Sequence, residues 1–427
     1  MSSLAFFCLE KGINVYGSDR AESNITKSLV DKGAKVFYSH LAKNLPHCDA
    51  VVFTSAIDEK NEELIEAKKR GIRIYPRAEF LSSILSLFRK SIGIAGCHGK
   101  TTATAMIANV LIQAGLDPTV FLGGEDKNFS NFRLGGGDIV LTEACEYKKN
   151  LSYLSPSIAL VLNVDNDHLD SYADMEDLTD TFRKFVKGKI SVINADDKNS
   201  LPLFNDSTVT FGINEKATYT AKNIKFNGKG YSFTACIYSK SVCRINLKVS
   251  GVHNVYNALS CLAVCHILGC EPQTIKKGLE SFCGVKRRDE YLGEYKGLKV
   301  YADYAHHPKE IFATLNAYKT RADKFAVIFQ PHTFSRTKIL MQDFVDVFRS
   351  VDNLILFSTY PAREEYDYLG SEQKLYENLI SFGCSSKIAL SKEELLREID
   401  GIKDKVDSLL VLGAGDIYQI FDKITKK

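Results

Sequence analysis

The sequence lacks the features that mark membrane, secreted and nucleic-acid-binding proteins. No apolar stretch approaches the roughly 20 residues that a membrane-spanning helix needs, and residues 80–88 are among the longest. No basic segment followed by an apolar core opens the chain, so we expect no secretory signal. Neither sign of charge predominates, because 55 lysines and arginines stand against 52 aspartates and glutamates. We therefore expect no membrane and no nucleic acid among the partners.

The cysteines lack the spacing of a metal site or a disulfide framework. There are eleven, an odd number, and no Cys-x-x-Cys pair occurs. Several lie in apolar segments, as Cys261 and Cys265 do, where a thiol packs as a small hydrophobic side chain. We expect buried, reduced thiols and hence a cytoplasmic location.

What is present is the pattern of an α/β protein. Short β-rich runs alternate with amphipathic helical stretches, which is typical of parallel sheets covered by helices. The length of 427 residues suggests about three domains. We place them at residues 1–88, 89–286 and 287–427. The expected strands are residues 13–16, 35–37, 50–53 and 72–75 in the first domain, 91–95, 139–142, 158–164 and 190–194 in the second, and 299–302, 325–329, 354–357, 388–390 and 409–412 in the third.

Two further segments of the second domain have their own patterns. Between about 208 and 249 the alternation of apolar and polar residues favours an antiparallel insertion or edge hairpins. The helix expected at 254–268 ends at Gly269, a residue type that is common just after a helix.

A glycine-rich turn separates the expected strand 91–95 from an expected helix. Its backbone N–H groups and the helix N-terminus can face an anion, Lys100 adds positive charge, and Thr101 can hold Mg²⁺. The strict motif has a glycine where Ile94 stands, but strand, turn and helix come in the required order. A plain strand-turn-helix with a solvated lysine is the alternative. We predict that the nucleotide-binding residues here are Gly96, Cys97, His98, Gly99, Lys100, Thr101 and Thr102.

A metal ion at such a loop needs partners at the carboxyl ends of neighbouring strands. Glu143 follows one expected strand and His168 follows another, so both are placed to join Thr101 around Mg²⁺. Ordinary surface polarity is the alternative for both. For Asp165 and Asp167, turn formation is the stronger interpretation.

Three polar segments are candidates for ligand recognition. Asn254 and Asn257 are one turn apart at the start of a helix, where both amides can reach a purine edge; capping by Asn254 is the alternative. Residues 303–308 and 330–337 follow strands of the third domain, at the edge where open α/β sheets bind ligands. The adjacent His306 and His307 suggest zinc, but no second ligand pair with metal spacing lies near them in the sequence.

Taken together, these segments resemble the Mur ligases of peptidoglycan synthesis. The resemblance extends over essentially the whole chain, and nine motifs in family order carry it. They are residues 96–102, 143–146, 163–168, 253–257, 287–288, 303–308, 329–337, 360–365 and 413–416.

The resemblance implies a fold and a reaction. It implies a Rossmann-like domain for a UDP moiety, a central ATPase with a phosphate-binding loop, and a C-terminal doubly wound α/β domain. The implied reaction forms an amide between UDP-N-acetylmuramate and L-alanine through an acyl phosphate, with ATP and Mg²⁺. Two alternatives remain: a ligase that attaches a recycled tripeptide to the same nucleotide sugar, and an inactive nucleotide-binding homologue.

The resemblance also implies roles for single residues. Lys100, Glu143, His168 and Arg336 would be catalytic, with the metal held by Thr101, Glu143 and His168. Positions around ATP are matched by His253, Asn254, Asn257, Arg288 and Asp303. Substrate positions are matched by Asp19, His306, His332 and Arg336, and Arg336 is expected to grip the alanine carboxylate through two hydrogen bonds.

The chain departs from the family pattern in two places. Cys97 stands where threonine is usual, and we expect little effect because the loop works through its backbone. The family's glycine-rich turn, which would precede residues 1–5, is not in the sequence. We hypothesise that Met1 is an internal methionine of a longer chain and that the first domain is the least stable part.

Overall fold

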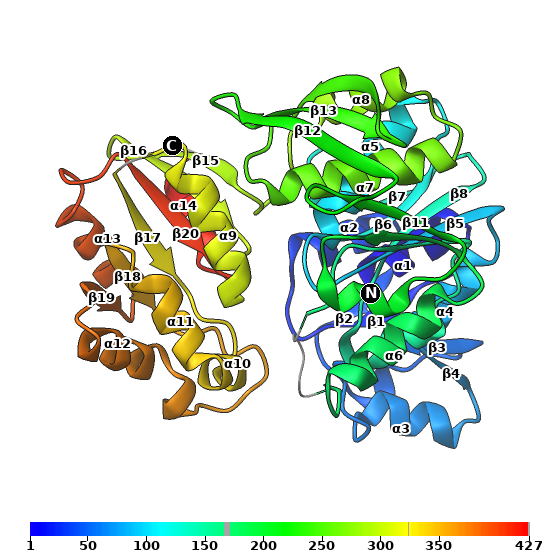
Figure 1. Ribbon diagram of the computed structural model, residues 1–427. Helices are drawn as coiled ribbons and strands as arrows, with labels where there is room; N and C mark the ends of the chain where they lie inside the picture. Colours follow the sequence, from blue (N-terminus) through cyan, green and yellow to red (C-terminus); the bar gives the residue numbers. More distant parts are fainter. Residues whose placement is uncertain (166–170, 323, 426–427) are drawn as a thin grey trace. The chain divides into compact units, whose positions relative to one another are not determined.

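The computed structural model describes residues 1–165, 171–322 and 324–425. The chain divides into two compact units. Unit 1 comprises Met1–Ile224, Phe233–Asn246 and Val255–Phe282, and unit 2 comprises Lys225–Ser232, Leu247–Asn254 and Cys283–Lys427. Both contain parallel strands and helices, so the expected α/β class is confirmed (Figure 1). Short 3-10 helices occur at η1 (Ala42–Asn44), η2 (Tyr147–Tyr153), η4 (Lys198–Leu203) and η5 (Tyr368–Gly370).

The N-terminal segment carries two separate two-stranded parallel sheets. β1 (Tyr16–Ser18) pairs with β2 (Lys35–Phe37), and β3 (Ala50–Phe53) pairs with β4 (Arg73–Pro76). None of these strand residues is buried, and Ile13 is 53% exposed. The strand predicted at 13–16 is therefore wrong in its bounds, because it begins only where Tyr16 lies opposite Lys35.

The helices of the same segment are α1 (Ser2–Glu10), α2 (Asn24–Asp31), α3 (Glu62–Lys69) and α4 (Arg77–Leu85). Of these, α1 and α4 supply apolar side chains to the core of unit 1. The ring of Phe7 on α1 lies 5.7 Å from that of Phe121 and 6.4 Å from that of Phe132. Leu81 and Leu85 of α4 belong to the same buried cluster. The first helices are thus fixed to the next sheet by hydrophobic burial.

A ten-stranded sheet forms the centre of unit 1, in the order β14-β13-β12-β11-β10-β9-β5-β8-β6-β7. Its strands are β5 (Lys90–Ala95), β6 (Thr119–Asp126), β7 (Ser130–Arg133), β8 (Ile139–Ala144), β9 (Ile158–Val161), β10 (Ile190–Asn194), β11 (Thr208–Gly212), β12 (Tyr219–Phe226), β13 (Tyr231–Ile237) and β14 (Lys240–Asn246). The associated helices are α5 (Lys100–Gln113), α6 (Met175–Val186), α7 (His253–Ile267) and α8 (Pro272–Ser281). β5 lies between β8 and β9, parallel to both, so its carboxyl end is flanked by two others.

We expected an antiparallel insertion or edge hairpins between about 208 and 249, and antiparallel pairing is wrong for β11 on both of its sides. β11 pairs in parallel with β10, and β12 pairs in parallel with β11 where Phe211 lies opposite Tyr219. Alternating hydrophobicity predicts a strand that is buried on one face, but it does not predict the direction of the neighbouring strand.

Unit 2 contains a six-stranded sheet in the order β15-β16-β20-β17-β18-β19. Its strands are β15 (Glu290–Tyr295), β16 (Leu298–Asp303), β17 (Phe325–Phe329), β18 (Leu354–Phe357), β19 (Ser386–Ala389) and β20 (Ser408–Leu412). All neighbours are parallel except β15 and β16. β20, the last in sequence, lies between β16 and β17.

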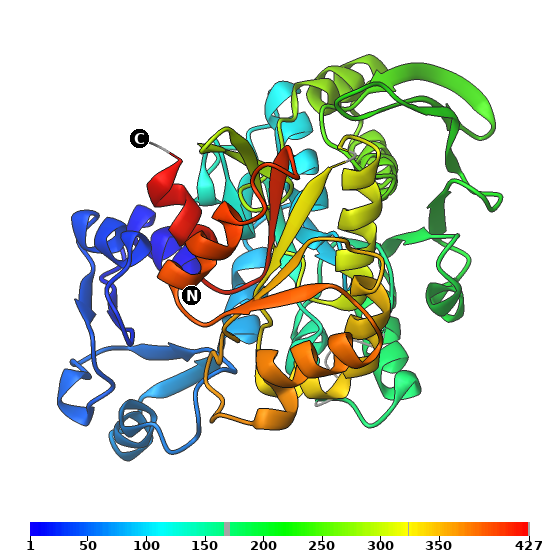
Figure 2. The same ribbon diagram turned by 90° about the vertical axis from the view of Figure 1, so that its left-hand side faces the viewer.

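Helices cover both faces of this sheet, as a doubly wound fold requires (Figure 2). They are α9 (Pro308–Lys319), α10 (Phe334–Ile339), α11 (Met341–Phe348), α12 (Glu372–Ser381), α13 (Lys392–Asp400) and α14 (Tyr418–Ile424). One buried cluster joins α9, α11 and α12 to the sheet, and another joins α13 and α14 to it.

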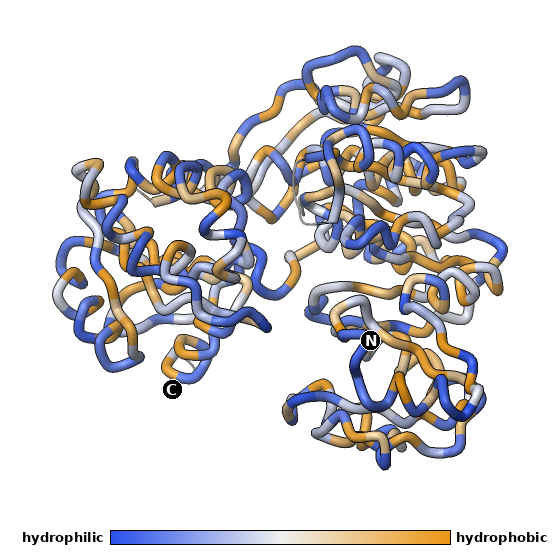
Figure 3. Tube along the Cα trace, turned by 90° about the horizontal axis from the view of Figure 1, so that it is seen from below, coloured by the Kyte–Doolittle hydropathy of each residue, from blue (hydrophilic) through white to orange (hydrophobic). Residues whose placement is uncertain are grey.

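Apolar segments are short throughout the described chain, and polar segments interrupt them (Figure 3). Among the helices of residues 1–165, 171–322 and 324–425, none is long and apolar enough to cross a membrane. All eleven cysteines are free thiols, as expected, and Cys261 and Cys265 lie buried on α7. The expectation of burial is wrong for Cys283, which is exposed.

Candidate functional site

The turn at residues 96–99 joins β5 to α5 and has the conformation that its glycines permit. Gly96 and Gly99 have φ of 135° and 85°, a region that other residues rarely adopt. A Cβ at Gly96 would lie 3.1 Å from the backbone nitrogen of Asn163, so the turn also needs glycine for close approach. α5 begins at Lys100, and its N-terminus faces the turn. The predicted strand-turn-helix is confirmed, and this geometry suits an anion.

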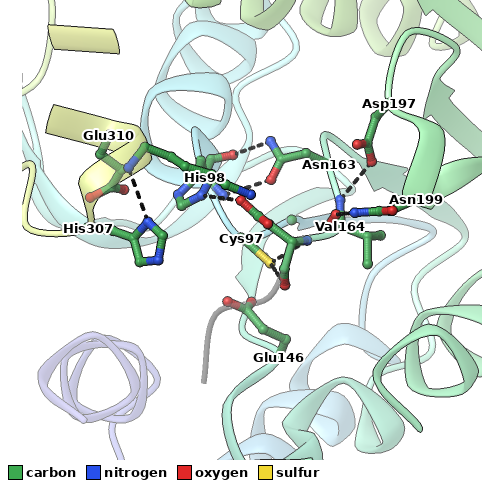
Figure 4. Close-up of polar contacts among 12 residues, drawn as sticks. Cys97, His98, Glu146, Asn163, Val164, Asp197, Asn199, His307 and Glu310 are labelled. Carbon is green, nitrogen blue, oxygen red and sulfur yellow. Dashed lines mark hydrogen bonds and ion pairs between the residues drawn. The ribbon is translucent and has the colours of Figure 1, made fainter. Parts of the chain in front are cut away.

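Side chains after β9 hold this turn in place (Figure 4). The amide of Asn163 accepts a hydrogen bond from the His98 backbone N–H (2.9 Å) and donates to the His98 carbonyl (3.0 Å). The Cys97 thiol donates to the carbonyl of Asp165 and accepts from its N–H, both at 3.1 Å. Cys97 therefore also ties the turn to residue 165, which our expectation of a passive side chain missed.

The backbone that holds the turn is itself braced (Figure 4). The N–H of Val164 donates to Asp197 at 2.8 Å, and the Asn199 amide donates to the Val164 carbonyl at 2.8 Å. The His98 imidazole lies 3.3 Å from an Asp165 carboxylate oxygen. These bonds fix the loop before any ligand binds, and a preorganised loop loses little freedom on binding.

Thr101 and Glu143 come together as predicted. The Thr101 hydroxyl donates to Glu143 Oε2 at 3.0 Å, and the other oxygen of Glu143 accepts from the Gly123 N–H. A hydroxyl and a carboxylate are hard oxygen donors, which fit Mg²⁺. His168 lies outside the described residues, and within the described part no group of three or more His, Cys, Asp or Glu side chains is arranged for a metal.

Lys100 is not the solvated lysine of the alternative interpretation. Only 16% of its side chain is exposed, and its ammonium forms an ion pair with Glu146, whose side chain is fully buried. Burial is the largest single effect and lowers the pKa of Lys100, but the charge and hydrogen bond of Glu146, together with Cys145 and Cys97, outweigh it, so the pKa is raised above its ordinary value. Glu146 was not among our predicted site residues. Its place three residues after Glu143 in a family motif was the available signal.

On α7 the two predicted asparagines lie one turn apart and have different surroundings. The Asn257 amide oxygen would lie 2.8 Å from a Cβ at Gly99, so this side chain packs against the backbone of the turn at residues 96–99. The Asn254 amide donates to the Ser250 carbonyl at 2.6 Å. Burial, with a smaller effect of Arg288, lowers the pKa of the neighbouring His253 to about 4. His253 is therefore a neutral imidazole at neutral pH.

Arg288 and Asp303 lie near each other in unit 2. The Asp303 carboxylate accepts the backbone N–H groups of Asp289 and Ala305, at 2.8 and 2.9 Å. Burial raises its pKa to about 6, although the positive charge of Arg288 opposes that shift. Arg288 also lies over the ring of Tyr304, at 5.1 Å from the centroid.

His306, His332 and Arg336 form the second cluster that the sequence predicted. The two imidazoles are 5.6 Å apart between ring centroids, and Arg336 donates to His332 Nδ1 at 3.4 Å. Burial lowers the pKa of His332 to about 3, with His306 and Arg336 adding to the effect. The ring of Tyr360 stacks on His332 at 5.5 Å. A guanidinium beside neutral rings is suited to bind a carboxylate.

Arg287 is a residue of this region that our site prediction missed. Its guanidinium donates to the carbonyls of Gly413 and Gly415, at 2.7 and 2.9 Å, and lies over the rings of Tyr304 and Tyr418. Arg287 thereby connects its own motif, at residues 287–288, to the motifs at 303–308 and 413–416. Its place beside Arg288 in the motif at residues 287–288 was the available signal in the sequence.

Asp19 and Arg77 of the N-terminal segment differ in their surroundings. Asp19 follows β1, is exposed, and accepts the N–H of Arg20 at 2.7 Å. Arg77, which we did not predict, begins α4. Burial lowers its pKa, while the nearby charges of Cys145 and Glu143 oppose that shift. Thr102, the last residue of the predicted loop, lies buried in α5.

Three family models match the chain, one after another. The Mur ligase family catalytic domain matches residues 1–89, the Mur ligase middle domain matches 94–265, and the glutamate ligase domain of Mur ligases matches 287–415.

Similar proteins match along nearly their whole length. UDP-N-acetylmuramate--L-alanine ligase of Clostridium kluyveri is 41% identical, with 98% of this chain and 94% of the relative covered. The enzyme of the same name from Aquifex aeolicus is 39% identical, with 100% and 95% covered. The solved UDP-N-acetylmuramate-alanine ligase of Thermotoga maritima has a TM-score of 0.85 at 29% identity, with 100% and 96% covered. A murein peptide ligase of Psychrobacter arcticus shares the fold, with a TM-score of 0.75 at 22% identity and the same coverage of both chains.

Proposed function

This chain belongs to the Mur ligase family, and from that premise we propose that it joins L-alanine to UDP-N-acetylmuramate, with conversion of ATP to ADP and phosphate. The observation that carries the proposal is similarity along the full chain, at 38–41% identity, to relatives named UDP-N-acetylmuramate--L-alanine ligase. The predicted loop, Thr101–Glu143 pair and arginine–histidine cluster are all present to support it.

The reaction has two steps. The lactyl carboxylate of UDP-N-acetylmuramate attacks the γ-phosphorus of ATP, which gives an acyl phosphate and releases ADP. The neutral amino group of alanine then attacks the acyl carbon, and the tetrahedral intermediate expels phosphate as the amide forms. The ammonium group of alanine loses one proton when it becomes the neutral amine. The nitrogen loses a second proton as the amide forms.

The unit 1 residues match the needs of the first step. Phosphoryl transfer depends mainly on positioning and on stabilising negative charge. The backbone N–H groups at the start of α5 and the ammonium of Lys100 supply donors of this kind. Mg²⁺, which Thr101 and Glu143 would hold, with His168 as a proposed third ligand, supplies further neutralisation of phosphate charge when bound.

The remaining predicted residues match the needs of recognition. We assign the nucleotide to His253, Asn254, Asn257, Arg288 and Asp303, together with the loop of residues 96–102. We assign the alanine and muramoyl carboxylates to His306, His332 and Arg336, and the nucleotide sugar to Asp19. We retain the domain boundaries at residues 88 and 286 as part of this proposal.

The comparisons favour alanine over the recycled tripeptide as the second substrate, because the alanine-ligase structure is the more similar of the two. An inactive homologue is disfavoured because Lys100, Glu143 and Arg336 are all present. We also propose a cytoplasmic location, because eleven free cysteines suit a reducing compartment.

The test is phosphate release with ATP, UDP-N-acetylmuramate and a panel of amino acids. We expect release that depends on both the nucleotide sugar and alanine. Release with L-alanyl-γ-D-glutamyl-diaminopimelate instead of alanine would establish the recycling alternative. ATP hydrolysis that does not depend on the nucleotide sugar or on alanine would contradict the ligase proposal.

A further inference from the structure

The ammonium of Lys100 is fully engaged by the protein. Its Nζ is within hydrogen-bonding distance of the carbonyls of Gly96 and Cys97 and lies 3.0 and 3.1 Å from the two carboxylate oxygens of Glu146. An ammonium has three N–H donors, so these acceptors use all of them. Contact with a phosphate oxygen therefore requires the exchange of at least one of these bonds.

The partners of Lys100 differ in how readily they can be given up. A backbone carbonyl is neutral and retains its own lone pairs for water or another donor. The carboxylate of Glu146 is charged and has no exposed surface, so its separation from the ammonium would break a buried ion pair. The bonds to Gly96 and Cys97 are the ones to exchange, and the bond to Glu146 is the one to keep.

Glu146 is also fixed in space. The hydroxyl of Tyr172, a buried residue, donates to the Glu146 backbone carbonyl. The next turn places Lys148 and Lys149 in left-handed conformations, with φ of 49° and 57°. Residues other than glycine rarely adopt this conformation, and it persists where the surroundings demand it. The carboxylate is thus held at one point beside the loop.

We propose that Glu146 is a positioning residue for phosphoryl transfer, which holds the Lys100 ammonium at the loop while that ammonium exchanges its carbonyl partners for phosphate oxygens. The inference rests on the proposed function. It predicts a small effect on binding of the nucleotide ground state and a large effect when charge develops on the transferring group, because only then must the ammonium be correctly oriented.

Two substitutions separate charge from shape. Glu146→Gln keeps the size and one acceptor but removes the charge, and Glu146→Asp keeps the charge but shortens the reach. The matched control is Asp126→Asn, because Asp126 is also a buried carboxylate of unit 1 but accepts from the N–H of Asn128 in its own turn. Circular dichroism and thermal unfolding establish that each variant is folded.

The first measurement is the steady-state kinetics of ligation. We expect Glu146→Gln to lower kcat at least tenfold with a change in the KM for ATP of less than about threefold, and Glu146→Asp to fall between it and the wild type. Asp126→Asn should retain the wild-type values of kcat and of the KM for ATP. A folded Glu146→Gln variant with kcat within twofold of the wild type would overturn the inference.

The second measurement does not need the ligase reaction. Titration calorimetry compares MgADP alone with MgADP plus aluminium fluoride, which mimics the transferring phosphoryl group. Glu146→Gln should weaken the second complex at least tenfold and the first less than threefold, and it should have no further effect in a Lys100→Met background. If Glu146→Gln weakened the aluminium fluoride complex equally in the wild type and in the Lys100→Met background, Glu146 would not act through Lys100.

Failure of the proposed function would look different. A wild type that binds both probes but does not ligate alanine would overturn the ligase assignment and leave the calorimetric result to decide on Glu146. A wild type that binds neither probe would overturn the phosphate-loop assignment and, with it, the positioning role.

Discussion

The hydroxyl of Thr101 donates a hydrogen bond of 3.0 Å to a carboxylate oxygen of Glu143. This bond joins the first turn of α5 to the carboxyl end of β8, two elements that are adjacent only because β5 and β8 pair in parallel. The pair places two hard oxygen donors within reach of one cation.

The first prediction concerns that cation. Thr101→Val removes one oxygen donor at nearly constant size, so the Mg²⁺ concentration for half-maximal phosphate release should rise on the order of tenfold or more. Thr101→Ser, which restores the hydroxyl, is the control and should behave as the wild type. An unchanged Mg²⁺ requirement in Thr101→Val would remove Thr101 from the metal site.

The second prediction concerns Lys100→Ala. Loss of a preorganised donor should lower the ligation rate by about 10²–10³. Loss of the ion pair with the buried carboxylate of Glu146 should also lower the free energy of unfolding, on the order of 3 kcal/mol. Urea denaturation and phosphate release measure the two effects.

The control for Lys100→Ala is Lys90→Ala, since Lys90 is exposed on β5. It should change neither quantity appreciably. If Lys100→Ala retained more than a tenth of wild-type turnover, the assignment of the loop would be wrong.

The third prediction concerns Arg336→Lys. A lysine cannot reproduce two parallel hydrogen bonds to a carboxylate, so the KM for alanine should rise and the KM for ATP should stay nearly constant. Arg349→Lys, at an exposed ion pair with Asp346, is the control. Equal rises for both substrates would indicate a structural role for Arg336.

The fourth prediction is a pH dependence of stability. Burial is the main reason that the pKa of His332 falls to about 3, so its imidazole is neutral in the folded protein at pH 5. The unfolded chain binds a proton at this residue below about pH 6.5. Its contribution to stability is therefore complete above that pH and is lost progressively as the pH falls towards 3.

His332→Gln removes this dependence. Between pH 7 and pH 5 the wild type should lose about 1–2 kcal/mol more unfolding free energy than the variant, as measured by urea denaturation. His47→Gln is the control, because His47 is exposed. Parallel pH profiles for wild type and His332→Gln would contradict the prediction.

The fifth prediction concerns the N-terminal sheets. Each has two strands without a buried residue, and isolated two-stranded sheets are marginally stable. Amides of β1 to β4 should exchange with deuterium earlier than those of β5, β8 and β9 in native-state experiments. Equal protection in both groups would show that the whole of unit 1 unfolds as one.

Local signals made much of the fold and of the loop predictable. The turn at Gly96 and Gly99 could be predicted because positive φ favours glycine. Strand β5 could be predicted because its short apolar run ends at this turn. Glu143 could be paired with Thr101 because parallel strands end at one edge of a sheet.

The features that were missed depend on contacts distant in sequence. The burial of Glu146 and the direction of β12 are set by neighbours that no local pattern specifies. Cys97 was interpreted through its size alone, whereas its thiol acts through hydrogen bonds to residue 165.

The position of β20 in its sheet has a consequence for protein synthesis. Leu409 pairs with Val300 on one side, and Leu410 pairs with Val327 on the other. As the ribosome delivers the nascent chain, β16 and β17 emerge long before the strand that separates them. Their facing edges stay unpaired until residue 412 has been translated, and unpaired apolar strands are prone to aggregate. A ribosome stalled before β20 would thus expose a sheet open at its middle, where chaperones that bind extended apolar segments would be expected to act.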